Sequence, residues 1–262
     1  MTTLTHALED SGTMVARQLR HLWRYPSMTL LLAGMPIFFL LVFVYVFGGA
    51  MGAGADGAAN RADYLNYVAP GMMLIAVASA SQGTAISVAM DMTEGIVARF
   101  RTMDIARVSV LTGHVVGSLV QTMLSVTLVT IVALLIGFRP TAGPLEWLGA
   151  AGVLMMVSFS LTWLTVALGL VAKTVESASN LPMPLVFLPF LGSSFVPTET
   201  LPTALRWFAE YQPFTPIIET LRGLLMGTEI GDSGMIAVAW CAGIALLSYL
   251  WAKKLYNRDP AA

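Results

Sequence analysis

Residues 108–138 read VSVLTGHVVGSLVQTMLSVTLVTIVALLIGF and contain no Asp, Glu, Lys or Arg. An α-helix needs about 20 predominantly apolar residues to cross the hydrocarbon core of a bilayer, and this stretch has 31. In lipid each backbone N–H and C=O group must bond within its own element, so a long apolar run favours a helix. The stretch therefore predicts a membrane-spanning helix rather than the short alternating strands of a transmembrane barrel.

Five further intervals between charged residues are long enough to cross a bilayer, which gives six predicted spans. They contain 31, 27, 26, 22 and 20 residues and cover 25–55, 64–90, 147–172, 177–198 and 233–252. We therefore expect an all-α polytopic membrane protein in which residues 1–262 form a single transmembrane domain.

The composition supports this class and excludes several others. Of the 262 residues, 56% are hydrophobic and 11% are charged, whereas a soluble domain has about 25% charged residues. The 15 acidic and 14 basic residues are too few to cover the surface of a soluble enzyme. The high apolar content also excludes a disordered chain. The chain also lacks the basic excess of a nucleic-acid-binding protein. Cys241 is the only cysteine, which excludes a disulfide scaffold.

The basic residues predict the orientation. Six spans place both termini on one side, together with ten of the fourteen Lys and Arg residues. Because cytoplasmic loops are enriched in Lys and Arg, both termini are predicted to be cytoplasmic.

An amphipathic segment, residues 11–25, precedes the first predicted span. Its apolar and basic residues fall on opposite helical faces, with Val15, Leu19, Leu22 and Trp23 on one and Arg17, Arg20, His21 and Arg24 on the other. This pattern indicates a helix that lies in the headgroup plane and contacts membrane lipids. A topology anchor and a surface that also contacts a cytoplasmic partner both fit it.

The loop 91–107 is the most charged short stretch of the chain. It contains Asp91, Glu94, Arg99, Arg101, Asp104 and Arg107, and also Ile96, Phe100 and Met103 at helical spacing. The apolar stripe predicts a short helix presented to a partner. The alternative is a solvated cytoplasmic loop, which explains the arginines but not Phe100 and Met103.

The outer segment 197–230 is charged, yet it is also rich in apolar residues. Four prolines divide it into short pieces: Pro197, Pro202, Pro213 and Pro216. We predict two short amphipathic helices that dip into the outer leaflet and form a broken hairpin before the last span. A buried pair of Glu219 and Arg222, three residues apart, would let the second helix enter without an isolated charge.

The polar residues inside the predicted spans are uncharged. Most, including Thr84, Ser118 and Thr162, are interpreted as helix-packing residues, because small polar side chains commonly join helices in membranes. Gln82 and Gln121 are larger and more costly to bury, and are the candidates for a substrate path.

The chain carries no apparent energy source or catalytic centre of its own. No Asp, Glu, Lys or Arg lies within a predicted span, and His114 is the only titratable candidate there for coupling transport to protons or ions. The sequence has no phosphate-binding loop, no nucleophile paired with a base and no metal-ligand spacing. We therefore expect no metal or cofactor on this chain, no enzymatic activity of its own, and energy supplied by another polypeptide.

Two stretches resemble the permease subunit of type-2 ATP-binding-cassette exporters. The first runs from Glu94-Gly95 through Arg99-Phe100-Arg101 to Arg107 and Gly113, and it looks like the coupling-helix loop of that family. The second is the more specific and contains Ser194, Phe195, Val196, Pro197, Leu201, Pro202, Trp207, Pro213, Thr215, Glu219 and Arg222. The sequence of residues 91–95, DMTEG, is most similar to the daunorubicin-resistance-type branch of actinobacteria. Asp104 departs from the family, which usually has proline there.

The resemblance implies a multi-pass permease in the bacterial plasma membrane that works by alternating access. Its partners would be ATPase subunits that use ATP and Mg, docked on the coupling loop, and a second permease copy or a paralogue. The branch implies export of amphipathic drugs or lipids, and hence multidrug efflux and antibiotic resistance. Two alternatives remain: an exporter of a glycolipid or polysaccharide, and a non-transporting membrane sensor or assembly protein in which 91–107 is an ordinary turn.

Overall fold

The computed structural model describes Gly12, Thr13, Val15, Ala16, Arg20 and Arg24 singly, and then residues 26–48, 61–94 and 107–256. Every regular element within these ranges is a helix. In chain order they are α2 (Pro26–Val42), the π-helix η1 (Phe43–Phe47), α4 (Arg61–Thr93), α6 (Arg107–Leu135), α7 (Pro144–Val171), α8 (Val175–Asn180), α9 (Met183–Phe187), the 3₁₀ turns η2 (Leu188–Leu191) and η3 (Thr198–Thr200), α10 (Thr203–Tyr211), α11 (Phe214–Met226) and α12 (Ser233–Tyr256).

Four of the described helices are long and apolar enough to cross a membrane, so the all-helical class is confirmed but the count of six spans is not. They cover Arg61–Thr93, Leu111–Leu135, Pro144–Val171 and Ser233–Tyr256. The first predicted span corresponds to a shorter apolar helix, Leu32–Phe47.

The fifth predicted span, 177–198, is not one continuous helix. It is divided into α8, α9 and η2, with a turn at Leu181 and Pro182. Proline has no backbone N–H and its ring clashes with the preceding turn, so Pro182, Pro184 and Pro189 prevent a regular helix through this interval.

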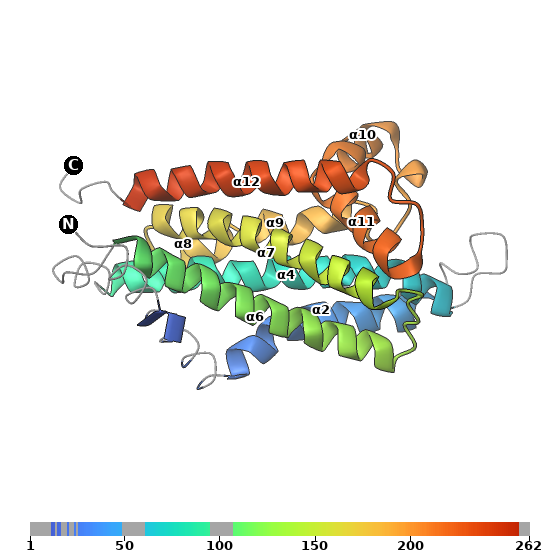
Figure 1. Cartoon of the computed structure of the whole chain (residues 1–262), viewed down its shortest axis with the longest axis horizontal. Coiled ribbons are helices and arrows are strands. Elements are labelled where there is room, and N and C mark those ends of the chain that lie inside the picture. The colour runs from blue at the N-terminus through green and yellow to red at the C-terminus, as the bar shows by residue number, and fades with distance from the viewer. Residues whose placement is uncertain are drawn as a thin grey trace.

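The long helices α4, α6, α7 and α12 lie side by side along the longest axis of the protein; α4, α7 and α12 run in one direction and α6 runs in the opposite direction (Figure 1). The C-terminal ends of α4, α7 and α12 and the N-terminal end of α6 therefore lie at one end of the bundle, which we call the α4–α6 end. Helices α10 and α11 lie at the opposite end, which we call the α10–α11 end.

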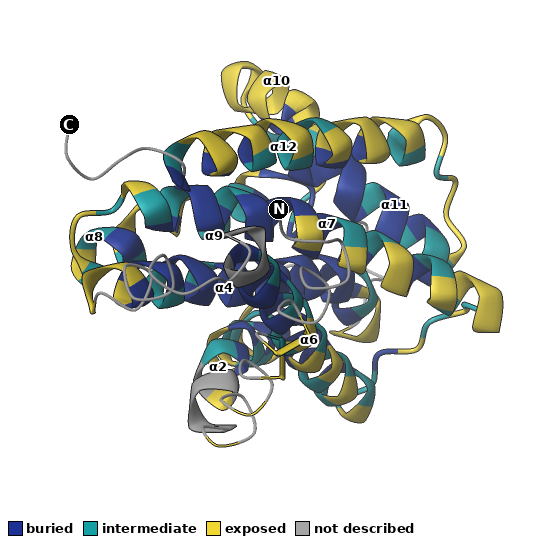
Figure 2. Ribbon diagram, turned by 60° about the vertical axis from the view of Figure 1, so that its left-hand side comes forward, coloured by how far each residue is buried: buried dark blue, intermediate teal, exposed yellow. Residues whose placement is uncertain are grey.

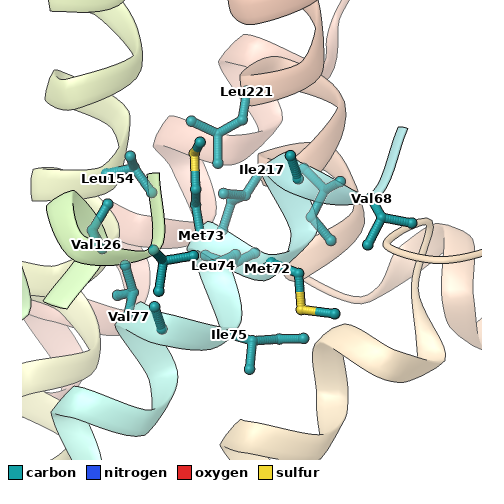
Figure 3. Packing of buried hydrophobic residues seen from close by; sticks show 14 of the residues in the cluster. Val68, Met72, Met73, Leu74, Ile75, Val77, Val126, Leu154, Ile217 and Leu221 are labelled. Carbon is teal, nitrogen blue, oxygen red and sulfur yellow. The ribbon is translucent and has the colours of Figure 1, made fainter. Parts of the chain in front are cut away.

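Helix α4 is the centre of the bundle. In its most apolar stretch 83% of the residues are buried, against 33% in α6 and 22% in α12, and Figure 2 shows the exposed faces of α10 and α12 turned outward. The main core joins α4 with α6, α7 and α11 (Figure 3), through Val68, Met72, Met73, Leu74, Ile75, Val77, Val126, Leu154, Ile217 and Leu221. Small residues of α4 allow close approach, because a Cβ on Gly71 would lie only 2.7 Å from the Cβ of Ser194.

Local signals define the ends of two helices at the α10–α11 end. Pro144 is the first residue of α7, where a missing N–H has no cost, and the Glu146 carboxylate accepts a hydrogen bond from the Gly143 N–H. Helix α11 ends at Gly227, whose φ of 73° is left-handed and favours glycine.

Candidate functional site

The predicted coupling loop lies between α4 and α6, and the structure describes its two flanks. Glu94 is exposed in the turn directly after α4, and its N–H donates to the Met90 carbonyl at 2.9 Å. Arg107 is the first residue of α6. The other predicted coupling residues lie outside the described residues: Ile96, Arg99, Phe100, Arg101, Met103 and Asp104. Their contact with a partner stays a prediction.

The predicted interface helix is described only in part. Arg20 and Arg24 are helical and exposed, and Arg17 lies outside the described residues. The position of this segment in the headgroup plane also stays a prediction.

A buried pair of Asp91 and His114 at the α4–α6 end is the feature that sequence reasoning missed. The Nε2 atom of His114 lies 3.0 Å from Oδ2 of Asp91, and the two side chains are only 4% and 11% exposed. The predicted span 64–90 stopped one residue before Asp91, whereas α4 continues to Thr93 and buries Asp91 in its last turn. No sequence signal joined residues that stand 23 positions apart.

The two glutamines proposed for a substrate path lie on different helices, α4 and α6. The Gln82 Nε2 atom of α4 donates to the Ser179 carbonyl of α8 at 2.5 Å, so this side chain fastens the broken fifth segment to the central helix. Gln121 is half-buried on α6. Their role in a substrate path is not tested.

Buried hydroxyl groups connect α4, α6 and α7 about one turn further into the bundle than His114. Ser118 Oγ lies 2.5 Å from Thr84 Oγ1 and 3.3 Å from Thr162 Oγ1. All three side chains are buried, and their contacts agree with the interpretation of these residues as helix-packing residues.

Two short helices occupy the outer segment, and they differ in their surroundings. On α10, Trp207 is 66% exposed, and its ring centroid lies 5.4 Å from that of Tyr211. Most residues of α11 are buried in the main core, including Ile217 and Leu221. Pro197, Pro202 and Pro213 each stand directly before a helical piece: η3, α10 and α11. Whether these helices dip into the outer leaflet stays a prediction.

Arg222 of α11 joins three parts of the α10–α11 end. Its Nη2 atom donates to the Ser193 carbonyl at 2.7 Å and to the Tyr67 carbonyl at 3.3 Å. Its guanidinium lies 3.9 Å from the centre of the Tyr67 ring, a cation–π contact. Burial lowers the pKa of Arg222 from its ordinary value, with Tyr67 and Glu219 opposing the shift, and a guanidinium stays charged in proteins.

The predicted direct pair of Glu219 and Arg222 is not formed. The Glu219 carboxylate instead accepts a hydrogen bond of 2.7 Å from the Ser233 hydroxyl at the start of α12. Arg222 instead donates hydrogen bonds to backbone carbonyls, and Glu219 acts on it only through its charge, without a direct hydrogen bond.

Phe195, a residue of the motif before the last span, is a packing residue. It is 6% exposed, and its ring stacks on Phe43 at 4.3 Å and on Phe190 at 4.9 Å between centroids. It therefore joins η1 to the end of the broken fifth segment. Among residues 26–48, 61–94 and 107–256, no group of three or more His, Cys, Asp or Glu side chains is placed to hold a metal ion.

Comparisons with known proteins point to one kind of membrane protein. The sequence profile of the ABC-2 type transporter family matches residues 10–226. The chain is 30% identical over 257 residues to the daunorubicin resistance ABC transporter permease protein DrrB1 of Streptomyces coeruleorubidus, covering 95% of this chain and 89% of the relative. It is 23% identical over 216 residues to the probable doxorubicin resistance ABC transporter permease protein DrrC of Mycobacterium tuberculosis, covering 81% of this chain and 75% of the relative. It is also 25% identical over 193 residues to ABC transporter G family member 20 of Dictyostelium discoideum, covering 71% of this chain and 25% of that longer protein.

Proposed function

The chain belongs to the ABC-2 type transporter family, and from this premise we propose that it is the membrane-spanning subunit of an ATP-driven exporter of amphipathic drugs or lipids. The observation that carries the substrate class is the similarity, over 95% of the chain, to a permease whose name refers to daunorubicin resistance. Four long apolar helices agree with a multi-pass membrane protein. We place it in the bacterial plasma membrane with both termini in the cytoplasm, as the distribution of bases predicts.

The energy for transport comes, in this proposal, from a separate ATPase subunit that uses ATP and Mg. The sequence has no phosphate-binding loop, so hydrolysis requires a partner. The connection between α4 and α6, residues 94–106, is the proposed docking point. It joins α4 and α6, two helices that pack against each other, which supports its role as the place where the ATPase moves the permease.

The working unit is proposed to contain two permeases, either two copies of this chain or this chain and a paralogue, and two ATPases. The exposed sides of α2, α6 and α12 carry large apolar residues, among them Phe38, Leu124 and Leu247, that require lipid or a second permease around them. Closure of the ATPases on ATP then switches the pair between inward-open and outward-open states, and the cargo leaves toward the outer leaflet or the outside.

The test is transport by the purified complex. The chain is co-expressed with an ATP-binding-cassette ATPase subunit, reconstituted into liposomes, and assayed for ATP-dependent accumulation of daunorubicin, with a hydrolysis-deficient ATPase as control. We expect uptake only with the active ATPase. Uptake of a fluorescent lipid or glycolipid but not of daunorubicin would favour a lipid exporter. Failure of any ATPase to co-purify would contradict the proposal and favour a sensor or assembly protein.

A further inference from the structure

The pair of Asp91 and His114 occupies a particular place in the chain. Asp91 stands two residues before the end of α4, and His114 stands seven residues after the start of α6. The two side chains therefore bridge the two helices that are joined, in sequence, by residues 94–106. The distance from His114 Nε2 to Asp91 Oδ2 is 3.0 Å, and both side chains are buried.

Burying a carboxylate is costly unless strong hydrogen bonds compensate, so a pair at this depth requires a reason beyond filling space. Apolar residues of similar volume would often hold two helices together as well or better. An apolar contact has no preferred direction and permits helices to slide and rotate, whereas a hydrogen bond to a carboxylate is directional and favours one relative position of the two helices.

The residues around the pair connect it to the other long helices. Val88, one turn before Asp91, and Leu111 and Val115, on either side of His114, belong to a second apolar cluster at the α4–α6 end. This cluster also contains Trp163 and Val166 of α7 and, from α12, Ala252 and Tyr256. A displacement of α4 and α6 together is thus passed to α7 and α12 through direct packing.

We propose that Asp91 and His114 are positioning residues that lock α4 to α6, so that a push on the connection between them moves both helices as one body. This inference rests on the proposed function, in which that connection receives the motion of the ATPase. Without the lock, the ends of α4 and α6 separate when pushed, and the motion is absorbed locally instead of opening the bundle.

The decisive variant replaces both residues by an apolar pair, Asp91→Leu with His114→Leu. Because such replacements are often neutral or stabilising, we expect the melting temperature of the complex to be at or above that of the wild type. We expect the ATPase to remain bound and to hydrolyse ATP. Loss of a charge-assisted hydrogen bond changes the ratio of locked to unlocked states about tenfold, so daunorubicin moved per ATP hydrolysed should fall by about that factor.

A second variant keeps a link without the charge. Asp91→Asn with His114→Gln places two amides that can still hydrogen-bond, so it should keep more than half of the wild-type ratio of transport to hydrolysis. Ser118→Ala is the matched control, since it removes a neutral hydrogen bond between the same two helices one turn deeper. It should keep the wild-type ratio.

A distance measurement separates this inference from the proposed function, because it does not depend on any substrate. Spin labels at Met92 and Val120, exposed positions on α4 and α6, should give one narrow distance distribution with and without ATP in the wild-type complex. The distribution should broaden in the double leucine variant. Wild-type coupling together with an unchanged distribution in that variant would overturn the role of the pair, as would an equal loss of coupling in Ser118→Ala. Absence of ATP-dependent daunorubicin uptake in the wild type would instead refute the proposed function.

Discussion

A close approach of α7 to α4 depends on Gly169 of α7, and replacing this residue by alanine should separate the two helices. A Cβ at this position would lie 2.7 Å from the Ala85 carbonyl oxygen and 3.1 Å from the Ala85 Cα atom. Ordinary Cβ contacts begin at 3.4 Å, so the backbones must move apart by about 0.7 Å. Because both obstructing atoms belong to the backbone of a helix, no side-chain rotation can relieve the clash.

The magnitude follows from the cost of overpacking, with a matched control in the same helix. Overpacking costs about 1–3 kcal/mol, while replacing a helical glycine by alanine recovers up to about 1 kcal/mol. A Cβ on Gly152 of α7 would meet nothing within 4 Å, so Gly152→Ala should gain the stabilisation of alanine over glycine in a helix without any steric clash. The difference between the two variants therefore isolates the clash, about 1–3 kcal/mol.

The assay is thermal unfolding of the detergent-solubilised protein, followed by tryptophan fluorescence. At about 2–4 °C per kcal/mol for a chain of this size, Gly169→Ala should melt several degrees below Gly152→Ala. Equal melting temperatures would refute the reasoning, because they would mean that α4 and α7 do not approach each other this closely at the α4–α6 end.

Three further predictions concern other parts of the protein. Arg222→Gln should lower the free energy of unfolding by about 2–4 kcal/mol, since it removes two hydrogen bonds from a cation and a cation–π contact. Arg206→Gln is the control and should leave the melting temperature unchanged, because the ion pair of Arg206 with Glu210 is exposed to solvent. An Arg222→Gln protein with the melting temperature of the wild type would contradict the role of Arg222 in joining the parts of the α10–α11 end. Phe100→Ala should weaken binding of the ATPase in a pull-down by about 2 kcal/mol or more, as loss of an aromatic anchor does. Full binding together with full transport in this variant would show that residues 91–107 are an ordinary turn and not a docking helix. A reporter fused after Asp10 or at the C-terminus should be cytoplasmic and one within 205–225 external, and an external C-terminus would overturn the assigned orientation.

The charge-free intervals predicted α4, α6, α7 and α12, because hydropathy measures the property that decides whether a helix can lie in lipid. The same criterion failed for 177–198. Hydropathy does not register the missing backbone N–H of proline, and Pro182, Pro184 and Pro189 were the available signal. Reading prolines inside an apolar run as breaks would have predicted the segmented fifth element.

The pairing of polar residues was beyond the reach of the sequence. The spacing along one helix predicted an ion pair of Arg222 with Glu219. In the folded protein Arg222 instead donates hydrogen bonds to the carbonyls of Ser193 and Tyr67, which tertiary packing brings close to it. Asp91 and His114 belong to different helices, and only the register between α4 and α6 brings them together. Periodicity describes which face of a helix a residue occupies, whereas contacts between helices depend on how their axes cross.

The central position of α4 has a consequence for how the protein is made. This helix is synthesised before α6, α7 and α11, the helices that cover it in the finished bundle. The Ser81 hydroxyl can bond at once to the Val77 carbonyl of its own helix, at 2.8 Å, but the partner of Thr84 is Ser118, which is translated 34 residues later. At about 5–20 residues per second, Thr84 remains without this partner for several seconds after it leaves the ribosome. The helix that ends up most deeply enclosed is therefore complete before the Thr84 hydroxyl can meet Ser118, and this contact between α4 and α6 forms only after α6 has been made.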